Sequence, residues 1–225
     1  MPWQSDFPQD VQVCAVQLPG RGARYQEAPI TDFVTLVPQV ARAVAELSDL
    51  PCVFFGHSLG ALIAFEVAHQ LRELDCVLPE HFVASAANSP SSAPTSHSLA
   101  QIESDDEFIE HLRRYGGTPE SLLENRELMA LLIPAIRADF KLLDSYRYRS
   151  RYPLAIPVSV FAGRDDSLLS ESGLASWGIE TEAMFKRHWL DGGHFYFQQS
   201  KSDLMDALGA VVKPLLLPRY LGNPA

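Results

Sequence analysis

The sequence predicts an α/β fold, with a mostly parallel central sheet, helices on both faces of the sheet and an inserted helical cap. Short apolar runs alternate with segments in which apolar residues recur every three or four positions, which is the pattern of βα units. One apolar run leads into a turn that holds a serine between glycines, and a helix pattern follows directly. Between residues 91 and 152 the alternation stops, and helix signals follow one another without a strand.

Length and composition indicate a globular chain of one domain with an inserted segment. The chain has 225 residues, of which 47% are hydrophobic and 20% are charged, and these are ordinary values for a folded domain. Its 18 lysine and arginine residues against 28 aspartate and glutamate residues give a net charge of -10. Such a chain lacks the basic footprint that nucleic acid or an anionic membrane requires, so we expect neither as a partner.

The cysteines and the N-terminus indicate a cytoplasmic protein, which we expect to be a monomer. Cys14, Cys52 and Cys76 are widely spaced and odd in number, which is typical of free thiols in a reducing compartment. Cys14 and Cys52 lie in apolar runs, so we expect them to pack in the core. The sequence shows neither a signal peptide nor an apolar run long enough to span a membrane.

Strands are predicted where short apolar runs end at turn residues. The fourth of them is bounded by Pro157 on one side and by Gly163 on the other. The predicted strands are Val11–Leu18, Cys52–Phe55, Phe82–Ala86, Val158–Ala162 and Lys186–Leu190.

Three core helices are predicted from apolar periodicity. The first follows Thr31 and carries an apolar stripe, and Pro38 either kinks it or marks its true start. The second spans Leu59 to Leu74, and the last runs from about Ser202 to near Pro214. The stripe of the first helix consists of Phe33, Leu36, Val37, Val40, Val44 and Leu47.

The segment at 91–152 is interpreted as a helical cap, inserted into an α/β core that is formed by residues 1–90 and 153–225. Ser104 and Glu107 form a capping box, and Gly116-Gly117 would stop that helix. Thr118-Pro119 then predicts an N-cap followed by a proline in the first helical position. The segment Glu127–Tyr146 is apolar on more than one face, so it should be covered on several sides. The alternative is an ordinary pair of crossover helices.

The strongest chemical signal is the segment Gly56-His57-Ser58-Leu59-Gly60, which has the Gly-x-Ser-x-Gly pattern between a strand and a helix. A nucleophilic serine needs a strained strand-to-helix turn that lifts its hydroxyl above the edge of the sheet. Glycine is expected at Gly56 and Gly60 because a Cβ would collide across that turn. The sequence therefore predicts Ser58 as a nucleophile, and the alternative is a purely structural serine.

A base and an orienting acid are expected later in the chain, in the order serine, aspartate, histidine. His194 follows the last predicted strand on a glycine-rich loop, and the alternative for it is a structural role. Asp165 and Asp166 both follow the predicted strand Val158–Ala162, and the spacing from Gly163 favours Asp166. Asp191 is a weaker rival, because a residue so close to the histidine on a tight loop seldom faces its ring. The loop Ser85–Ser89 contains no carboxylate.

Taken together, these and other motifs resemble the type II thioesterases of polyketide and nonribosomal-peptide assembly lines, a branch of the α/β-hydrolases. The resemblance covers residues from about 11 to 197. Its motifs are Val16–Arg24 with its Leu-Pro-Gly-Arg-Gly run, Phe55–Ala61, Asp105-Asp106, Gly116–Pro119, Leu132–Phe140 and Gly192–Phe195.

The resemblance implies hydrolysis of acyl groups from the phosphopantetheine thiol of acyl or peptidyl carrier proteins, which clears stalled or misprimed chains. No cofactor or metal of its own is implied, since the substrate arrives on the carrier's phosphopantetheine. A close alternative within the fold is the medium-chain thioesterase of fatty-acid synthesis. The carrier could dock near Arg21 and Arg24, near the basic run at 147–151, or elsewhere.

The residues agree with this chemistry. Ser58 would attack the thioester carbonyl while His194 takes its proton, and Asp166 would hold the imidazole tautomer and stabilise its charge. The backbone N–H of Leu59 would be one oxyanion donor. An apolar cap suits an acyl chain better than a sugar or a peptide.

One departure from the family concerns the N-terminus. In the family, a strand and a glycine-rich loop that donates the second oxyanion N–H precede the Leu-Pro-Gly-Arg-Gly strand, whereas here only Met1–Asp10 precede it, without glycine. That strand would lie between the strands at 11–18 and 52–55. Truncation is the simplest expectation, since every later motif is intact, and a weakened variant is the alternative. Competing hypotheses are therefore a catalytically silent carrier-binding fragment and a small-molecule ester hydrolase.

Overall fold

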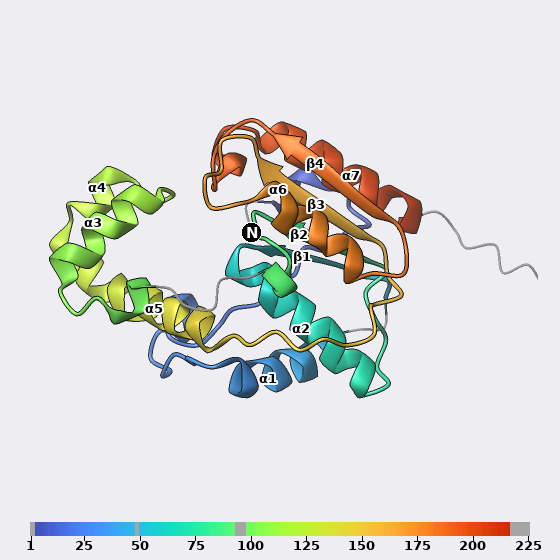
Figure 1. Ribbon diagram of the computed structural model, residues 1–225, viewed down its shortest axis with the longest axis horizontal. Helices are drawn as coiled ribbons and strands as arrows, with labels where there is room; N and C mark the ends of the chain where they lie inside the picture. Colours follow the sequence, from blue (N-terminus) through green and yellow to red (C-terminus); the bar gives the residue numbers. More distant parts are fainter. Residues whose placement is uncertain (1–2, 48–49, 93–97, 217–225) are drawn as a thin grey trace, which may run out of the picture.

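The computed structural model describes residues 3–47, 50–92 and 98–216, so residues 93–97 of the predicted cap lie outside the described residues (Figure 1). Its sheet has four parallel strands in the order β1-β2-β3-β4. They are β1 (Val53–His57), β2 (His81–Ser85), β3 (Val158–Gly163) and β4 (Phe185–Leu190). Each coincides with a predicted strand to within about two residues, so the prediction of a parallel sheet is confirmed.

The three predicted core helices are present as α1 (Phe33–Ala45), α2 (Leu59–Glu73) and α7 (Lys201–Leu216). Helices α3 (Asp105–Tyr115), α4 (Glu120–Leu123) and α5 (Arg126–Ser145) lie in the predicted cap segment, and α6 (Glu171–Ala175) follows β3. None of the helices in the described part of the chain is long and apolar enough to cross a membrane. Short 3-10 helices are η1 (Gln4–Asp6), η2 (Gly22–Arg24), η3 (Pro90–Ser92), η4 (Ser98–Gln101), η5 (Ser176–Ile179) and η6 (Tyr196–Gln198).

The alternation of side chains along each strand builds two separate core clusters. Phe82 and Ala84 of β2 point to the face that α2, α6 and η5 cover. Val83 of β2 and Phe161 of β3 point to the opposite face, against α7. Because both faces are buried, β2 and β3 carry apolar side chains in both directions, as central parallel strands do.

The predicted strand Val11–Leu18 is wrong. Residues 11–18 form no ladder with any described strand, and β1 is an edge of the sheet. The segment is held instead by the side chain of Gln4, which donates to the carbonyl of Val11 and accepts from the N–H of Val13. An extended run becomes a strand only when its backbone groups find a partner, and apolar composition does not supply one. Cys14 is consequently exposed rather than packed in the core.

Helix α1 begins at Phe33, with the Asp32 carboxylate accepting from the N–H of Thr35 as N-cap. Pro38 lies inside the helix, so the alternative that it marks the start is wrong. Leu47 lies beyond the last turn and is 69% exposed, so it does not extend the apolar stripe as predicted. Helix α1 packs against α2, which ends one residue before the predicted Leu74.

Helices α3, α4 and α5 form a lobe of their own, which stands to one side of the sheet in Figure 1 and is called here the α3–α5 lobe (residues 105–145). Ser104 caps α3 by accepting from the N–H of Glu107, as predicted. Pro119 rather than Thr118 is the N-cap residue of α4, so that predicted cap was misplaced by one residue. The lobe has its own apolar cluster, namely Leu99, Phe108, Leu112, Leu123, Met129, Ile133 and Phe140.

Helix α5 belongs to the lobe and also packs on the core that surrounds the sheet, and Pro134 lies inside it. Its C-terminal end packs on α1 and α2 through Leu142 and Tyr146, which follows the helix. There the Arg21 guanidinium binds the Asp139 carboxylate with two hydrogen bonds of 2.7 Å, which fixes α5 to the core.

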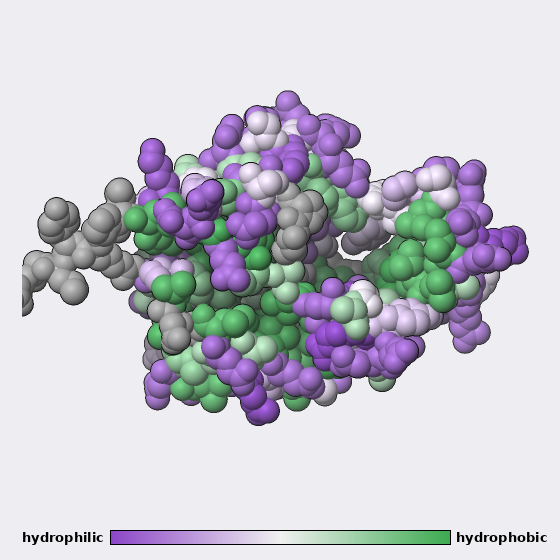
Figure 2. Space-filling view, turned by 180° about the vertical axis from the view of Figure 1, so that it is seen from behind, coloured by the Kyte–Doolittle hydropathy of each residue, from purple (hydrophilic) through white to green (hydrophobic). Residues whose placement is uncertain are grey.

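Contrary to the prediction, the second apolar face of α5 is left uncovered. Leu128, Leu131 and Leu132 are 44%, 50% and 39% exposed. Figure 2 shows hydrophobic surface gathered on the lobe, beside the hollow that separates it from the rest of the molecule.

Candidate active site

Ser58 stands on a strained turn where β1 passes into α2. Its φ of 53° and ψ of -120° lie in a region that side chains other than glycine rarely occupy. The turn is held by the N–H of Ser58, which donates to the carbonyl of Ser85 over 2.8 Å. A Cβ on Gly56 would lie 2.3 Å from the carbonyl oxygen of Gly60, so glycine is required at Gly56. The same expectation for Gly60 is wrong, because a Cβ there would point into open space.

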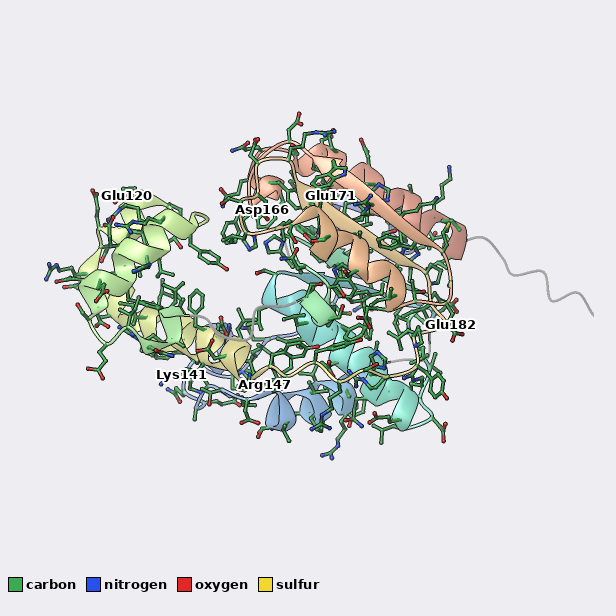
Figure 3. The ribbon with its side chains drawn as sticks, in the orientation of Figure 1. Glu120, Lys141, Arg147, Asp166, Glu171 and Glu182 are labelled. Atoms are coloured by element: carbon green, nitrogen blue, oxygen red, sulfur yellow. The ribbon has the colours of Figure 1, made fainter. Side chains whose placement is uncertain are left out.

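His194 and Asp166 come together from the loops that follow β4 and β3. The Nδ1 atom of His194 and the Oδ2 atom of Asp166 are 2.9 Å apart, and the two side chains are 6% and 0% exposed. The second oxygen of Asp166 accepts from the N–H of Leu168, which fixes the carboxylate. Figure 3 shows Asp166 at the side of the core that faces the α3–α5 lobe. Nε2 of His194 is buried and has no hydrogen-bond partner among the described residues, which leaves it available as a base.

The rival carboxylates lie elsewhere. Asp165 is exposed, with no hydrogen bond to His194. Asp191 pairs with Arg164 at the surface, over 3.2 Å. The geometry therefore selects Asp166 from the aspartates that the sequence left open.

The N-terminus of α2 lies directly behind Ser58. Leu59 is the first residue of that helix, where backbone N–H groups have no acceptor inside the helix. The partial positive charge of a helix N-terminus adds to this donor. The N–H of Leu59, the predicted oxyanion donor, therefore lies next to Ser58 at the start of this helix.

His57 is surrounded by groups that the sequence analysis missed. Its Nδ1 atom lies 2.8 Å from the Ser85 hydroxyl, which in turn lies 2.6 Å from the hydroxyl of Tyr196. Burial, together with the nearby His194, lowers the pKa of His57 to about 4, so this ring is neutral at neutral pH. The signal that could have found Ser85 is the register of parallel strands, which sets it beside His57 at the carboxyl ends of β1 and β2.

The lobe reaches the site at one turn. The ring of Tyr115 meets the ring of His194 edge-on, with centroids 5.6 Å apart. Next to it, Gly117 has a φ of +85°, and a Cβ there would lie 2.1 Å from the ring of Phe195. The end of α3 is thus seated directly on the loop that carries His194.

A pocket of about 680 Å³ opens between this turn and the core. Burial raises the pKa of the Tyr115 hydroxyl, so it stays protonated at the mouth of the site. The pocket is lined by Leu99, His111, Arg114, Tyr115, Gly116, Gly117, Asp165, Asp166, Ser167, Leu168, Gly193, His194, Phe195, Gln198 and Gln199.

Two of the arginines considered for carrier docking are engaged inside the molecule. Arg21 binds Asp139, and Nη2 of Arg151 donates to both carboxylate oxygens of Glu66. Within the described ranges, no group of three or more histidine, cysteine or acidic side chains could hold a metal ion.

A serine on a strained turn, a buried histidine–carboxylate pair and a helix N-terminus together suit acyl transfer. The chain matches the thioesterase domain family over residues 1–211. It is 34% identical to the gramicidin S biosynthesis protein GrsT of Aneurinibacillus migulanus over 217 residues, which cover 96% of this chain and 84% of that protein.

The solved structures that the chain resembles include two thioesterases. The first is the type II thioesterase BorB from the borrelidin biosynthetic cluster, with a TM-score of 0.79, 32% identity, and 90% of this chain and 80% of that chain covered. The second is RedJ from the prodiginine pathway in Streptomyces coelicolor, with a TM-score of 0.85, 31% identity, and 92% and 78% covered.

Proposed function

Because the chain belongs to the thioesterase domain family, we propose that it hydrolyses acyl groups from the phosphopantetheine thiol of acyl or peptidyl carrier proteins. It is a serine hydrolase that acts on thioesters, of the type II kind that nonribosomal-peptide and polyketide pathways contain. The observation that carries the proposal is the buried His194–Asp166 pair, which lies at the same end of the sheet as the strained turn of Ser58.

In the first half of the reaction, the hydroxyl oxygen of Ser58 attacks the thioester carbonyl, and its proton passes to Nε2 of His194. The Nδ1–H of His194 donates to Asp166 throughout, which stabilises the imidazolium that forms. The N–H of Leu59 stabilises the negative oxygen of the tetrahedral intermediate. The carbon–sulfur bond then breaks, and the sulfur takes the proton from Nε2 of His194 and leaves as the pantetheine thiol. The acyl group remains on Ser58, and His194 is again neutral.

In the second half, a water molecule attacks the acyl-serine carbonyl, and His194 takes its proton. The ester bond to Ser58 breaks, its oxygen receives that proton, and the free acid leaves. No external cofactor takes part in either step.

The acyl chain is proposed to lie against the uncovered face of α5, with the α3–α5 lobe acting as the cap of the site. The exposed side chains of Leu128, Leu131 and Leu132 offer an apolar surface. Burial of each methylene group there would contribute about 0.8 kcal/mol to binding, which favours an acyl chain over a sugar or a peptide. The proposed partner is therefore an acyl or peptidyl carrier protein, with which a single copy of this chain would work.

The test is release of free acid from an acylated phosphopantetheinyl carrier protein, followed by mass spectrometry. We expect the wild-type chain to release acid and Ser58→Ala to release none, whereas the matched control Ser92→Ala, an exposed serine, keeps full activity. Equal release by wild type and Ser58→Ala would refute the proposed nucleophile. A fluorophosphonate probe that labels Ser58 would exclude the silent carrier-binding fragment, and faster turnover of soluble short esters than of carrier thioesters would favour the ester hydrolase.

A further inference from the structure

A hydrogen-bonded chain of three side chains connects the strand of the nucleophile to the loop of the base. Tyr196 lies two positions after His194, Ser85 ends β2, and His57 directly precedes Ser58. The hydroxyls of Tyr196 and Ser85 are 2.6 Å apart, and both side chains are fully buried. From Ser85 the chain continues over 2.8 Å to Nδ1 of His57.

Ser85 holds the turn of the nucleophile in two ways. Its carbonyl accepts from the N–H of Ser58 over 2.8 Å, while its hydroxyl binds the ring of His57. Because β1 and β2 pair in register at this position, the two contacts fix both the backbone and the side chain that flank the strained residue. These hydrogen bonds therefore connect the turn of Ser58 to Tyr196, in the segment that carries His194. They do so without involving the side chain of Ser58 or of His194.

The ring of His57 is the surface on which that segment rests. Its centroid lies 5.1 Å from the ring of His194, 5.6 Å from Phe195 and 5.1 Å from Phe197. Rotation of the His57 ring would therefore displace His194, whose ring also contacts Tyr115 from the lobe.

On these contacts we propose that His57 is a positioning residue for His194, and that Ser85 and Tyr196 hold its ring in the required orientation. The ring holds Nε2 of His194 toward the nucleophile while Nδ1 keeps its hydrogen bond to Asp166. The inference rests on the proposed function only in that it takes His194 as the base.

Two features distinguish this role from simple core packing. Nε2 of His57 is buried and has no hydrogen-bond partner in the described part of the chain, which is a cost that an apolar side chain of similar size would avoid. The ring is also neutral at neutral pH, since its pKa lies near 4, so it places no positive charge beside the imidazolium that His194 must become.

The test uses Ser85→Ala and Tyr196→Phe, which remove one hydroxyl each and leave the His57 ring in place. With an acylated carrier protein as substrate, we expect kcat to fall by about tenfold and KM to stay unchanged. This loss is smaller than the roughly 100-fold decrease in rate that a 1 Å misplacement of a reacting group causes. The downfield proton NMR signal of the His194 Nδ1–H, assigned by its loss in His194→Gln, should shift in both variants. His57→Phe keeps an aromatic ring but removes the hydrogen bond to Ser85, so it should show the same decrease in kcat and the same change in the NMR signal.

His69→Phe is the matched control, because His69 is also a buried histidine, on α2, and binds Arg72 away from the site. It should lower the melting temperature without changing kcat or the NMR signal. If Ser85→Ala and Tyr196→Phe keep kcat within about twofold and the signal does not move, the positioning role is refuted. If His194→Gln itself remains active, the proposed function fails instead, and the two failures are thereby distinguished.

Discussion

Replacing Asp166 by asparagine tests the role of the carboxylate at nearly constant shape. The oxygen Oδ1 of Asp166 accepts from the N–H of Leu168 over 3.0 Å, so the amide oxygen of asparagine would keep this contact. The amide NH2 would then face Nδ1 of His194, at the 2.9 Å that now separates the ring from Oδ2. A donor there stabilises the tautomer that carries its proton on Nε2, and that nitrogen could no longer accept the proton of Ser58.

We expect Asp166→Asn to lower kcat by about 10⁴-fold, the loss known for this substitution in a serine protease triad, which corresponds to about 5 kcal/mol of barrier. Stability should not fall in parallel, because the variant removes a fully buried charge and keeps the volume. The assay is single-turnover release of acid from acyl carrier protein, together with the melting temperature. The control is Asp165→Asn, an exposed neighbour. An Asp166→Asn variant within tenfold of wild type, or an equal loss in Asp165→Asn, would refute the reasoning.

Other predictions concern the lobe and pH. Gly117→Ala should destabilise the seat on Phe195 by about 1–3 kcal/mol, since its φ is +85°, and faster amide exchange at the end of α3 would report it. Leu131→Gln should lower kcat/KM for a long acyl chain by about tenfold and for an acetyl group far less, and equal losses would contradict the proposed acyl surface. Burial depresses the pKa of His57 to about 4 and that of His69 to about 3, so the unfolded state binds protons first as pH falls from about 6.5. The free energy of unfolding should therefore decrease between about pH 6.5 and 4, and the His69→Phe variant should show a shallower decrease in urea titrations.

The candidate site residues could be proposed from the sequence because their pattern is local. The turn of Ser58 is specified by the strand before it, the glycine at Gly56 and the helix after it. His194 and Asp166 each follow a strand, and parallel strands bring their carboxyl ends to one edge. A chain order and a sheet rule were therefore sufficient to predict that His194 and Asp166 lie close together.

What the sequence did not reveal depends on partners that a single segment cannot show. The run at 11–18 has a strand composition but no ladder, because pairing is a property of two segments. The hydrogen bond between Ser85 and His57 depends on strand register, and neither residue carries a recognisable motif for it. Likewise, Leu131 shows that an apolar position on a helix is not necessarily a covered one.

The proline in α5 gives the lobe a mechanical property. Residues 126–133 form an arm of about 12 Å, at 1.5 Å per residue, whereas Asp139 is clamped to the core by Arg21. Pro134 lacks an N–H and so leaves out one backbone hydrogen bond, which makes it the position where bending the helix costs the least free energy. A bend of about 10° at Pro134 would move the far end of this arm of about 12 Å by about 2 Å, because the displacement is the arm length multiplied by the sine of the angle. Such a bend would open the contact between Gly117 and Phe195 before it strains the ion pair between Arg21 and Asp139. The C-terminal half of α5 would thus stay fixed to the core while its N-terminal half moves with the lobe.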